Sequence, residues 1–303
     1  MRYRERQVSG TKVVREGVLI KCVGGFYYVA SEGIVYECRL RGRFRRQEEE
    51  IVPGDRVGFQ ELAPGQGVIE ALLPRKNRLE RPTVANVDQV IIVFALSEPP
   101  PDLELLDRLL VLSLANGTEA VICWNKADIA REEFWDLPGV YERLGYRVLV
   151  TSARTGQGVE LLRAILRDRI STFAGPSGVG KSSLLNAVEP GLNLKTGEVS
   201  SKKGRGRHTT RQVELLCLKE GGMVADTPGF SRLYLPEIRR EELATYFLEM
   251  APYEGHCRFH SCLHRAEPGC AVRLAVEEGK IPQHRYEHYL KFLAEVIEAE
   301  RSY

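Results

Sequence analysis

The chain has 303 residues with 43% hydrophobic composition, enough for two or three domains and at least one sizeable core. A net charge of +2 excludes a uniformly polycationic nucleic-acid binder. No apolar run approaches the roughly 18–20 residues that span a bilayer. Because the N-terminus leads into no apolar signal core, we expect a cytoplasmic protein without membrane association, and we expect a monomer.

Residues 1 to about 75 are predicted to form short strands separated by turns. β-branched and aromatic residues fill runs at 18–20, 26–30, 34–38 and 56–59. This spacing predicts a small barrel, with a five-stranded oligonucleotide-binding (OB) fold favoured over other small β-domains. Five arginines between Arg39 and Arg46 would usually form a solvated face, but here they favour an RNA partner. We therefore expect an RNA-binding OB domain over residues 1–75, followed by a polar linker.

From about residue 83 to 240 the pattern changes to alternating strands and helices. Apolar runs predict buried strands at 87–96, 120–124, 147–150, 171–174, 213–218 and 222–225. Helices are predicted at 103–114, near 158–168 and from Lys181 onward. This alternation predicts a parallel α/β sheet that binds its ligand at the carboxyl ends of the strands. The last region, 241–303, is predicted to be mainly helical, with a final helix over about 283–300.

A phosphate-binding loop is predicted between the strand at 171–174 and the helix that follows. The pattern G-x-x-x-x-G-K-S is formed by Gly175, Pro176, Ser177, Gly178, Val179, Gly180, Lys181 and Ser182. Backbone N–H groups and the helix dipole would attract phosphate. Lys181 would reach the β- and γ-phosphates, the Ser182 hydroxyl would bind Mg²⁺, and Ser183 belongs to the same predicted site. The strand–loop–helix context argues against an ordinary Gly-rich turn.

Two further segments are typical of a nucleotide switch. In Asp226-Thr227-Pro228-Gly229, the Asp226 carboxylate would hold Mg²⁺ through water and the Gly229 amide would contact the γ-phosphate. A lone D-T-P-G is more often a turn, but its place downstream of the loop favours the switch interpretation. The segment 204–210, which contains Thr209 and Thr210, would supply a second hydroxyl ligand for Mg²⁺. We assign it to Thr210, with Thr209 as the open alternative.

Guanine specificity is predicted from Asn125-Lys126-Ala127-Asp128, which ends a strand. Asp128 can accept the ring N–H and the exocyclic amine of guanine, and adenine does not offer both. Ser152 and Ala153, at the end of the next strand, would complete the base pocket. These residues precede the phosphate loop, whereas an ordinary GTPase has them far downstream, so the GTPase order is circularly permuted. The permuted region ends just after Gly229, and we expect that short connection to carry the GTP state to the C-terminal region.

The residue that positions the attacking water is less sharply indicated. Many GTPases have a glutamine just after D-x-x-G, where this chain has Phe230. His208 is the nearest alternative, although a solvated or RNA-facing histidine is the simpler interpretation. The missing glutamine predicts slow intrinsic turnover and stimulation by a partner that orders residues 200–211.

A zinc site is predicted in the C-terminal region, where the pattern C-x4-C-x-H-x5-C is formed by Cys257, Cys262, His264 and Cys270. Three thiolates and one imidazole are the ligand set of a closed, structural zinc site. Few large apolar side chains lie between residues 252 and 270, so the metal would supply folding free energy. Two alternatives stay open from the residues: scattered reduced cysteines, or His256 or His260 as the ligand.

The order of these motifs resembles that of the circularly permuted, ribosome-small-subunit-dependent GTPases of the RsgA family, over nearly the whole chain. The resemblance implies an OB domain, a permuted GTPase domain over 83–240 and a zinc-binding domain over 241–303. It implies binding to the 30S ribosomal subunit and its 16S rRNA, a role in late subunit maturation, and subunit-stimulated hydrolysis of GTP to GDP. It also implies His264 as the zinc ligand and His208 as the catalytic histidine.

Two other functions fit parts of the pattern. A kinase or transferase would use the phosphate loop, but N-K-A-D and the lack of an evident acceptor-substrate motif count against it. An RNA-binding module with a vestigial nucleotide site is disfavoured by the intact Lys181, Ser182 and Asp226.

Overall fold

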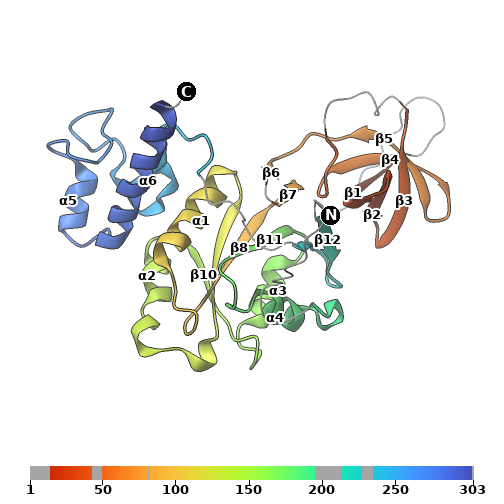
Figure 1. The fold of residues 1–303 in the computed structure, drawn as a ribbon, viewed down its shortest axis with the longest axis horizontal. Helices are drawn as coiled ribbons and strands as arrows, with labels where there is room; N and C mark the ends of the chain where they lie inside the picture. Colours follow the sequence, from red (N-terminus) through yellow and green to blue (C-terminus); the bar gives the residue numbers. More distant parts are fainter. Residues whose placement is uncertain (1–13, 43–49, 81, 195–212, 227–234, 302–303) are drawn as a thin grey trace, which may run out of the picture. The chain divides into compact units, whose positions relative to one another are not determined.

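The computed structural model describes residues 14–42, 50–80, 82–194, 213–226 and 235–301 (Figure 1). The chain divides into two compact units. The first comprises residues 1–89, 163–173 and 199–231, and the second comprises residues 90–162, 174–198 and 232–303. Within the described ranges, none of the helices is both long enough and apolar enough to cross a membrane.

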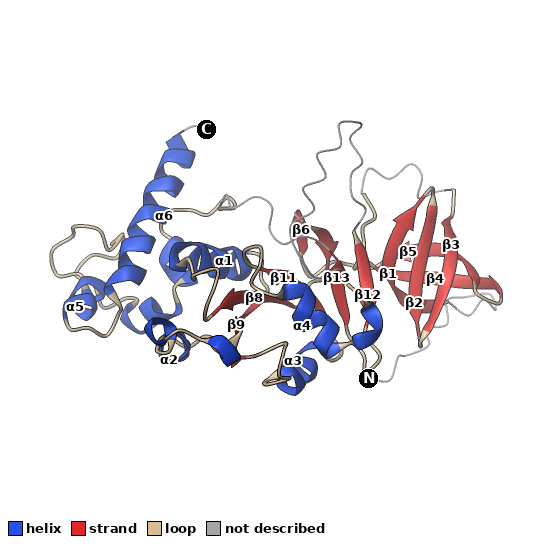
Figure 2. Ribbon diagram, turned by 60° about the horizontal axis from the view of Figure 1, so that its bottom comes forward, coloured by secondary structure: helices blue, strands red, loops and turns tan. Residues whose placement is uncertain are grey.

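The first unit begins with a closed five-stranded barrel in the order β1-β2-β3-β5-β4 (Figure 2). Its strands are Arg15–Val23 (β1), Phe26–Ser31 (β2), Ile34–Leu40 (β3), Arg56–Ala63 (β4) and Gln66–Leu72 (β5). β3 and β5 pair in parallel, whereas β1 pairs antiparallel with both β2 and β4. The interior is filled by buried side chains such as Leu19, Tyr36 and Phe59. The predicted OB-like barrel is confirmed, with β5 as a strand that the sequence pattern did not reveal.

The segment that follows the barrel is more ordered than a polar linker. Arg78–Glu80 (β6) and Thr83–Ala85 (β7) form a two-stranded antiparallel sheet. Leu79 and Val84 are buried in one cluster with residues that are distant in the sequence, namely Ile20, Val87, Ile170, Leu215 and Ala225. The polar linker was predicted over residues 73–82, and the prediction is wrong at Leu79, because β6 contributes this side chain to a core.

Six strands form the second sheet, in the order β10-β9-β8-β11-β13-β12. They are Gln89–Ala95 (β8), Glu119–Asn125 (β9), Arg147–Val150 (β10), Ile170–Ala174 (β11), Glu214–Cys217 (β12) and Met223–Asp226 (β13). β10 pairs in parallel with β9, and β11 with β13. β12 is antiparallel to β13, so the prediction of a parallel sheet is wrong at this strand. The connection at 218–222 fits a hairpin and is too short for a parallel crossover.

The helices of the GTPase region are Leu103–Ala115 (α1), Leu137–Arg143 (α2), Val159–Leu166 (α3) and Lys181–Val188 (α4). α1, α3 and α4 confirm the predicted helices, whereas α2 was not predicted. α1 begins where the Asp102 side chain accepts a hydrogen bond from the Leu105 N–H at 3.0 Å, a typical N-cap.

The C-terminal region is mainly helical, as predicted. It contains two 3₁₀ segments, Leu243–Tyr246 and Leu248–Tyr253, and the helices Ala271–Glu277 (α5) and Gln283–Arg301 (α6). α6 lies beside α1 (Figure 1). Their shared core includes Val111 of α1 together with Phe247, Tyr289, Phe292 and Val296. The C-terminal region is therefore packed against α1 within the second unit.

Candidate nucleotide-binding and zinc-binding sites

The phosphate loop depends on glycines at two positions. Gly175 has φ +125°, and a Cβ on it would lie 2.1 Å from the carbonyl oxygen of Val93. Gly180 has φ +97°, and a Cβ there would lie 2.4 Å from Nδ2 of Asn125. Both the backbone conformation and the available space exclude a side chain at these two positions, so the loop requires glycine there to keep this conformation.

Lys181 occupies the interior of this loop. Its Nζ donates hydrogen bonds to the carbonyl oxygens of Gly175 at 2.8 Å and Pro176 at 2.6 Å. Burial lowers the pKa of Lys181. Ser182 and Ser183 follow in the first turn of α4. An ammonium group and a helix N-terminus at one loop are suited to binding phosphate.

Asn125 connects the guanine motif to the phosphate loop. This residue ends β9, and its Nδ2 donates to the carbonyl oxygen of Val179 at 2.8 Å. Its Oδ1 lies 3.3 Å from the Thr151 hydroxyl and accepts a hydrogen bond from the Ala153 N–H at 3.2 Å. With three partners, the buried Asn125 amide has one orientation.

The guanine-reading carboxylate is also held in place. Asp128 Oδ1 accepts a hydrogen bond from the Ser152 hydroxyl at 2.6 Å. Arg154 Nε lies 3.5 Å from Asp128 Oδ2, an ion pair that we did not predict from the sequence, although Arg154 directly follows the Ser-Ala pair. Lys126 Nζ donates to the carbonyl oxygen of Glu98 at 2.5 Å. The structure thus brings together the predicted residues of the guanine motif and the phosphate loop.

The switch residues are only partly described. Asp226 is the last residue of β13, whose Met223 pairs with Ile170 of the parallel strand β11. The predicted residues His208, Thr209, Thr210 and Gly229 lie outside the described residues. The expected transmission of the GTP state through the connection after Gly229 therefore stays a prediction.

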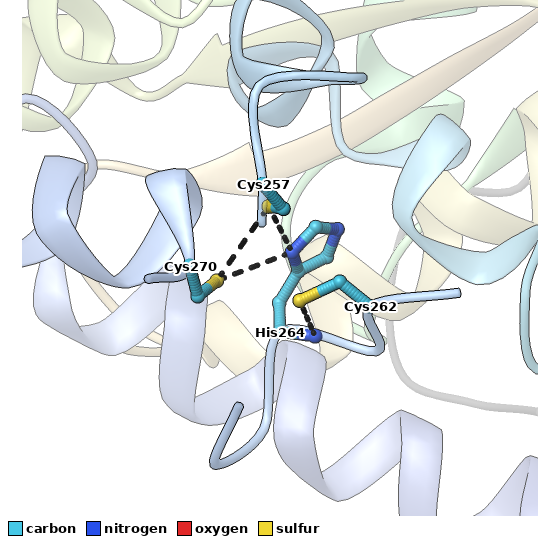
Figure 3. A group of neighbouring side chains, drawn as sticks. All are labelled: Cys257, Cys262, His264 and Cys270. Carbon is cyan, nitrogen blue, oxygen red and sulfur yellow. Dashed lines mark hydrogen bonds between the residues drawn. The ribbon is translucent and has the colours of Figure 1, made fainter. Parts of the chain in front are cut away.

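The four predicted zinc ligands converge, with ligand atoms within 4.8 Å of one another (Figure 3). His264 Nδ1 lies 3.5 Å from Cys257 Sγ and 3.4 Å from Cys270 Sγ, and the two sulfurs are 3.9 Å apart. Tetrahedral zinc with ordinary bond lengths would separate two sulfurs by about 3.8 Å and a sulfur from a nitrogen by about 3.6 Å. The residues therefore fit zinc, and they select His264 over His256 and His260.

The electrostatics of the cluster also suit zinc. Burial raises the pKa of the Cys262 thiol to about 12, and burial lowers the pKa of His264. Thiolates in this environment need a cation to compensate their charge, while the neutral imidazole supplies a lone pair. Backbone N–H groups of His264, Ala271 and Arg273 lie 3.3–3.5 Å from the three sulfurs and would stabilise the thiolates.

Glu267 supports the loop that carries His264. Its carboxylate accepts hydrogen bonds from the N–H groups of Leu263, Arg265 and Ala266 at 2.8–2.9 Å. Burial raises the pKa of this carboxyl, but the backbone N–H groups outweigh it and lower the pKa to about 2. The lowered pKa means that Glu267 stabilises the fold above pH 4.5, and that this contribution is lost as the pH falls from 4.5 toward 2.

The substitution Glu267→Gln should weaken zinc binding by about tenfold at neutral pH, because the charged acceptor behind the His264 loop is lost. Competition with a colorimetric zinc chelator measures the change. Glu277→Gln, on the exposed face of α5, is the matched control and should leave affinity unaltered. Equal zinc affinity in the two variants would contradict this role.

Two family models match consecutive stretches of the chain. The family model for the RsgA GTPase matches residues 72–236, and the model for the RsgA N-terminal domain matches residues 16–69. The small ribosomal subunit biogenesis GTPase RsgA of Moorella thermoacetica is 68% identical over 288 residues, which are 95% of this chain and 99% of that protein.

Two solved structures match this chain along nearly its full length. The crystal structure of YjeQ from Thermotoga maritima has a TM-score of 0.82 at 42% identity and covers 94% of this chain and 99% of its own. The structure of YloQ, described as a circularly permuted GTPase, has a TM-score of 0.81 at 37% identity and covers 97% and 99%. With these matches and its permuted motif order, the chain belongs to the RsgA family of circularly permuted GTPases and is a GTP-hydrolysing enzyme.

Proposed function

We propose that this protein binds the 30S ribosomal subunit and its 16S rRNA in the cytoplasm, as a monomer, and assists late maturation of the subunit. It hydrolyses GTP to GDP and phosphate when the subunit stimulates it. The observation that carries the nucleotide part is the bond from Asn125 to the carbonyl oxygen of Val179, which links the base-reading motif to the phosphate loop. The ribosomal part is supported by the name of the 68% identical relative, a small ribosomal subunit biogenesis GTPase.

The chain's own residues would divide the work in this proposal. Asp128 accepts the N–H groups of guanine, and the loop amides with Lys181 bind the phosphates. Ser182 and Thr210 would hold Mg²⁺ directly, and Asp226 through water. When bound, Mg²⁺ supplies positive charge to the β- and γ-phosphates. Zinc, held by Cys257, Cys262, His264 and Cys270, would be structural because four protein ligands leave no open position.

Phosphate release from GTP, measured with and without purified 30S subunits, tests the proposed function. We expect slow turnover alone, a rise of more than about tenfold with subunits, and little hydrolysis of ATP. A turnover rate that does not change when 30S subunits are added, or equal rates of GTP and ATP hydrolysis, would contradict the proposal.

The substitution His208→Ala should lower the subunit-stimulated rate by about 10²–10³-fold, because a group that positions water or donates to developing charge is lost. GDP affinity should stay unchanged, since a catalytic role does not include ground-state binding. Steady-state turnover with saturating 30S subunits gives the rate. His256→Ala, at an exposed histidine outside the zinc cluster, serves as the control. Undiminished stimulated turnover in His208→Ala would rule out the catalytic role.

A further inference from the structure

A cluster of charged side chains is buried in the second unit, away from the nucleotide and zinc ligands. Arg285 and Asp107 are fully buried, and Glu249 is 7% exposed. Arg285 Nε and Nη2 donate to the two carboxylate oxygens of Glu249 at 2.6 and 3.1 Å. Arg285 Nη1 lies 2.5 Å from Asp107 Oδ1, an ion pair by distance, although the angles do not make it a hydrogen bond and this nitrogen has none among the described residues. Burying three ionised groups is costly unless they are paired in good geometry, so this cluster calls for an explanation.

The cluster joins the C-terminal region to the GTPase region. Arg285 belongs to α6, whereas Asp107 belongs to α1. Asp107 Oδ1 accepts a hydrogen bond from the Tyr141 hydroxyl of α2 at 2.7 Å, and His288 Nδ1 of α6 lies 2.6 Å from Asp107 Oδ2. Arg285 also donates to the Tyr146 hydroxyl at 2.7 Å. One arginine from the zinc-binding region therefore fixes three groups of the GTPase region, directly or through Asp107.

Aromatic contacts continue from the cluster to the guanine motif. The Tyr141 ring centroid lies 6.1 Å from that of Trp124, which directly precedes Asn125. Trp124 is fully buried, and within the described part of the chain its indole N–H has no hydrogen-bond partner. Packing holds the Trp124 ring between Tyr141 and Phe94, and the ring centroids of Trp124 and Phe94 are also 6.1 Å apart. The position of Trp124 thus depends on where Tyr141 is held.

A second set of contacts leads from the cluster to the zinc ligands. The Arg285 guanidinium lies 4.8 Å from the centroid of Phe247, whose ring meets Tyr289 edge to face at 5.3 Å. The Tyr289 hydroxyl donates to the carbonyl oxygen of Leu263 at 2.8 Å, and the Tyr286 hydroxyl donates to that of His264 at 2.7 Å. Buried contacts therefore run without a break from the zinc-ligand loop to Asn125.

We propose that Arg285 is a positioning residue for guanine-nucleotide binding, which holds Tyr141 through Asp107 so that Trp124 keeps Asn125 against the phosphate loop. The inference rests on the proposed function, because it requires that a guanine nucleotide binds to the guanine motif and the phosphate loop. It adds a dependence of base binding on a residue of the zinc-binding region. Zinc and guanine nucleotide then stabilise the same buried arrangement, so each raises the affinity of the other by an equal factor.

The dissociation constant of a fluorescent GDP analogue, measured at a temperature where each variant is folded, tests the proposal, because a partly unfolded population would itself weaken the apparent affinity. Tyr141→Phe keeps the ring and removes the bond to Asp107, and Arg285→Lys keeps the charge but loses the multiple contacts. We expect GDP to bind about fivefold or more weakly to each, with turnover at saturating GTP within about twofold of wild type. Lys291→Ala removes an exposed ion pair with Glu104 at the same α1–α6 interface and should bind GDP like wild type.

Removal of zinc with a chelator provides the second readout. Wild type should then bind the GDP analogue about fivefold or more weakly, and Tyr141→Phe should respond less. Circular dichroism melting identifies the variants that are folded at the assay temperature. If the folded Tyr141→Phe and Arg285→Lys proteins bind GDP as tightly as Lys291→Ala, the positioning role is wrong while the proposed function stands. If wild type binds no guanine nucleotide, both fail.

Discussion

Replacing Cys270 by serine should abolish stable zinc binding and unfold the C-terminal region around it. Cys270 Sγ lies within 3.9 Å of Cys257 Sγ and 3.4 Å of His264 Nδ1, and it also caps α5 by accepting from the Arg273 N–H. A structural zinc site contributes apparent folding free energies of about 10–16 kcal/mol, which the few large apolar side chains between residues 252 and 270 cannot replace. Metal analysis should show zinc content falling from about one per chain to near zero.

The matched control for Cys270→Ser is Cys217→Ser, at an exposed cysteine outside the ligand cluster. That variant should keep its zinc and its melting temperature. Full zinc content and an unchanged thermal transition in Cys270→Ser would show that the four residues do not form the metal site.

The second large effect is expected from Asp128→Asn, which should convert a guanine site into a xanthine site. An aspartate can only accept hydrogen bonds when ionised, whereas an asparagine presents an N–H donor that suits the 2-carbonyl of xanthine and opposes the 2-amine of guanine. The Ser152 hydroxyl, 2.6 Å from Asp128, would still orient the amide. GDP affinity should fall by at least about 10²-fold while XDP affinity rises.

Competition of GDP and XDP against a fluorescent guanine nucleotide measures this change of base preference. Asp136→Asn, at an exposed aspartate of the same connecting segment, controls for the loss of one negative charge. GDP binding that survives Asp128→Asn would place the base elsewhere.

The sequence was sufficient for the parts of the molecule whose chemistry is local. The phosphate loop and the guanine motif are continuous stretches in which residue type and spacing are dictated by the ligand, and the structure brings Asn125 to Val179 as those motifs require. The choice of His264 over its neighbours followed from the family resemblance, and the side-chain geometry agrees with it.

The parts that could not be predicted depend on partners distant in sequence. Leu79 and Val84 look like isolated apolar residues in a polar stretch until they meet Ile170 and Leu215. Strand direction at β12 was assigned from the alternation of elements, although the short connection at 218–222 already favoured a hairpin. Asp107 and Arg285 give no periodic or motif signal, since each is a charged residue within an ordinary amphipathic helix.

The pairing of α1 with α6 has a consequence for synthesis of the protein. Translation produces Asp107 first, and His288, which binds the same carboxylate, is 181 residues further along the chain. Until α6 has been made, the Asp107 carboxylate has only the Tyr141 hydroxyl among these partners, and water must satisfy the oxygen that His288 later contacts, so the surface of α1 that carries it must stay hydrated. Contacts of such high sequence separation form late, because a long loop must close before they contribute stability. The guanine-reading half of this GTPase therefore completes its core only after the ribosome has translated the zinc-binding region.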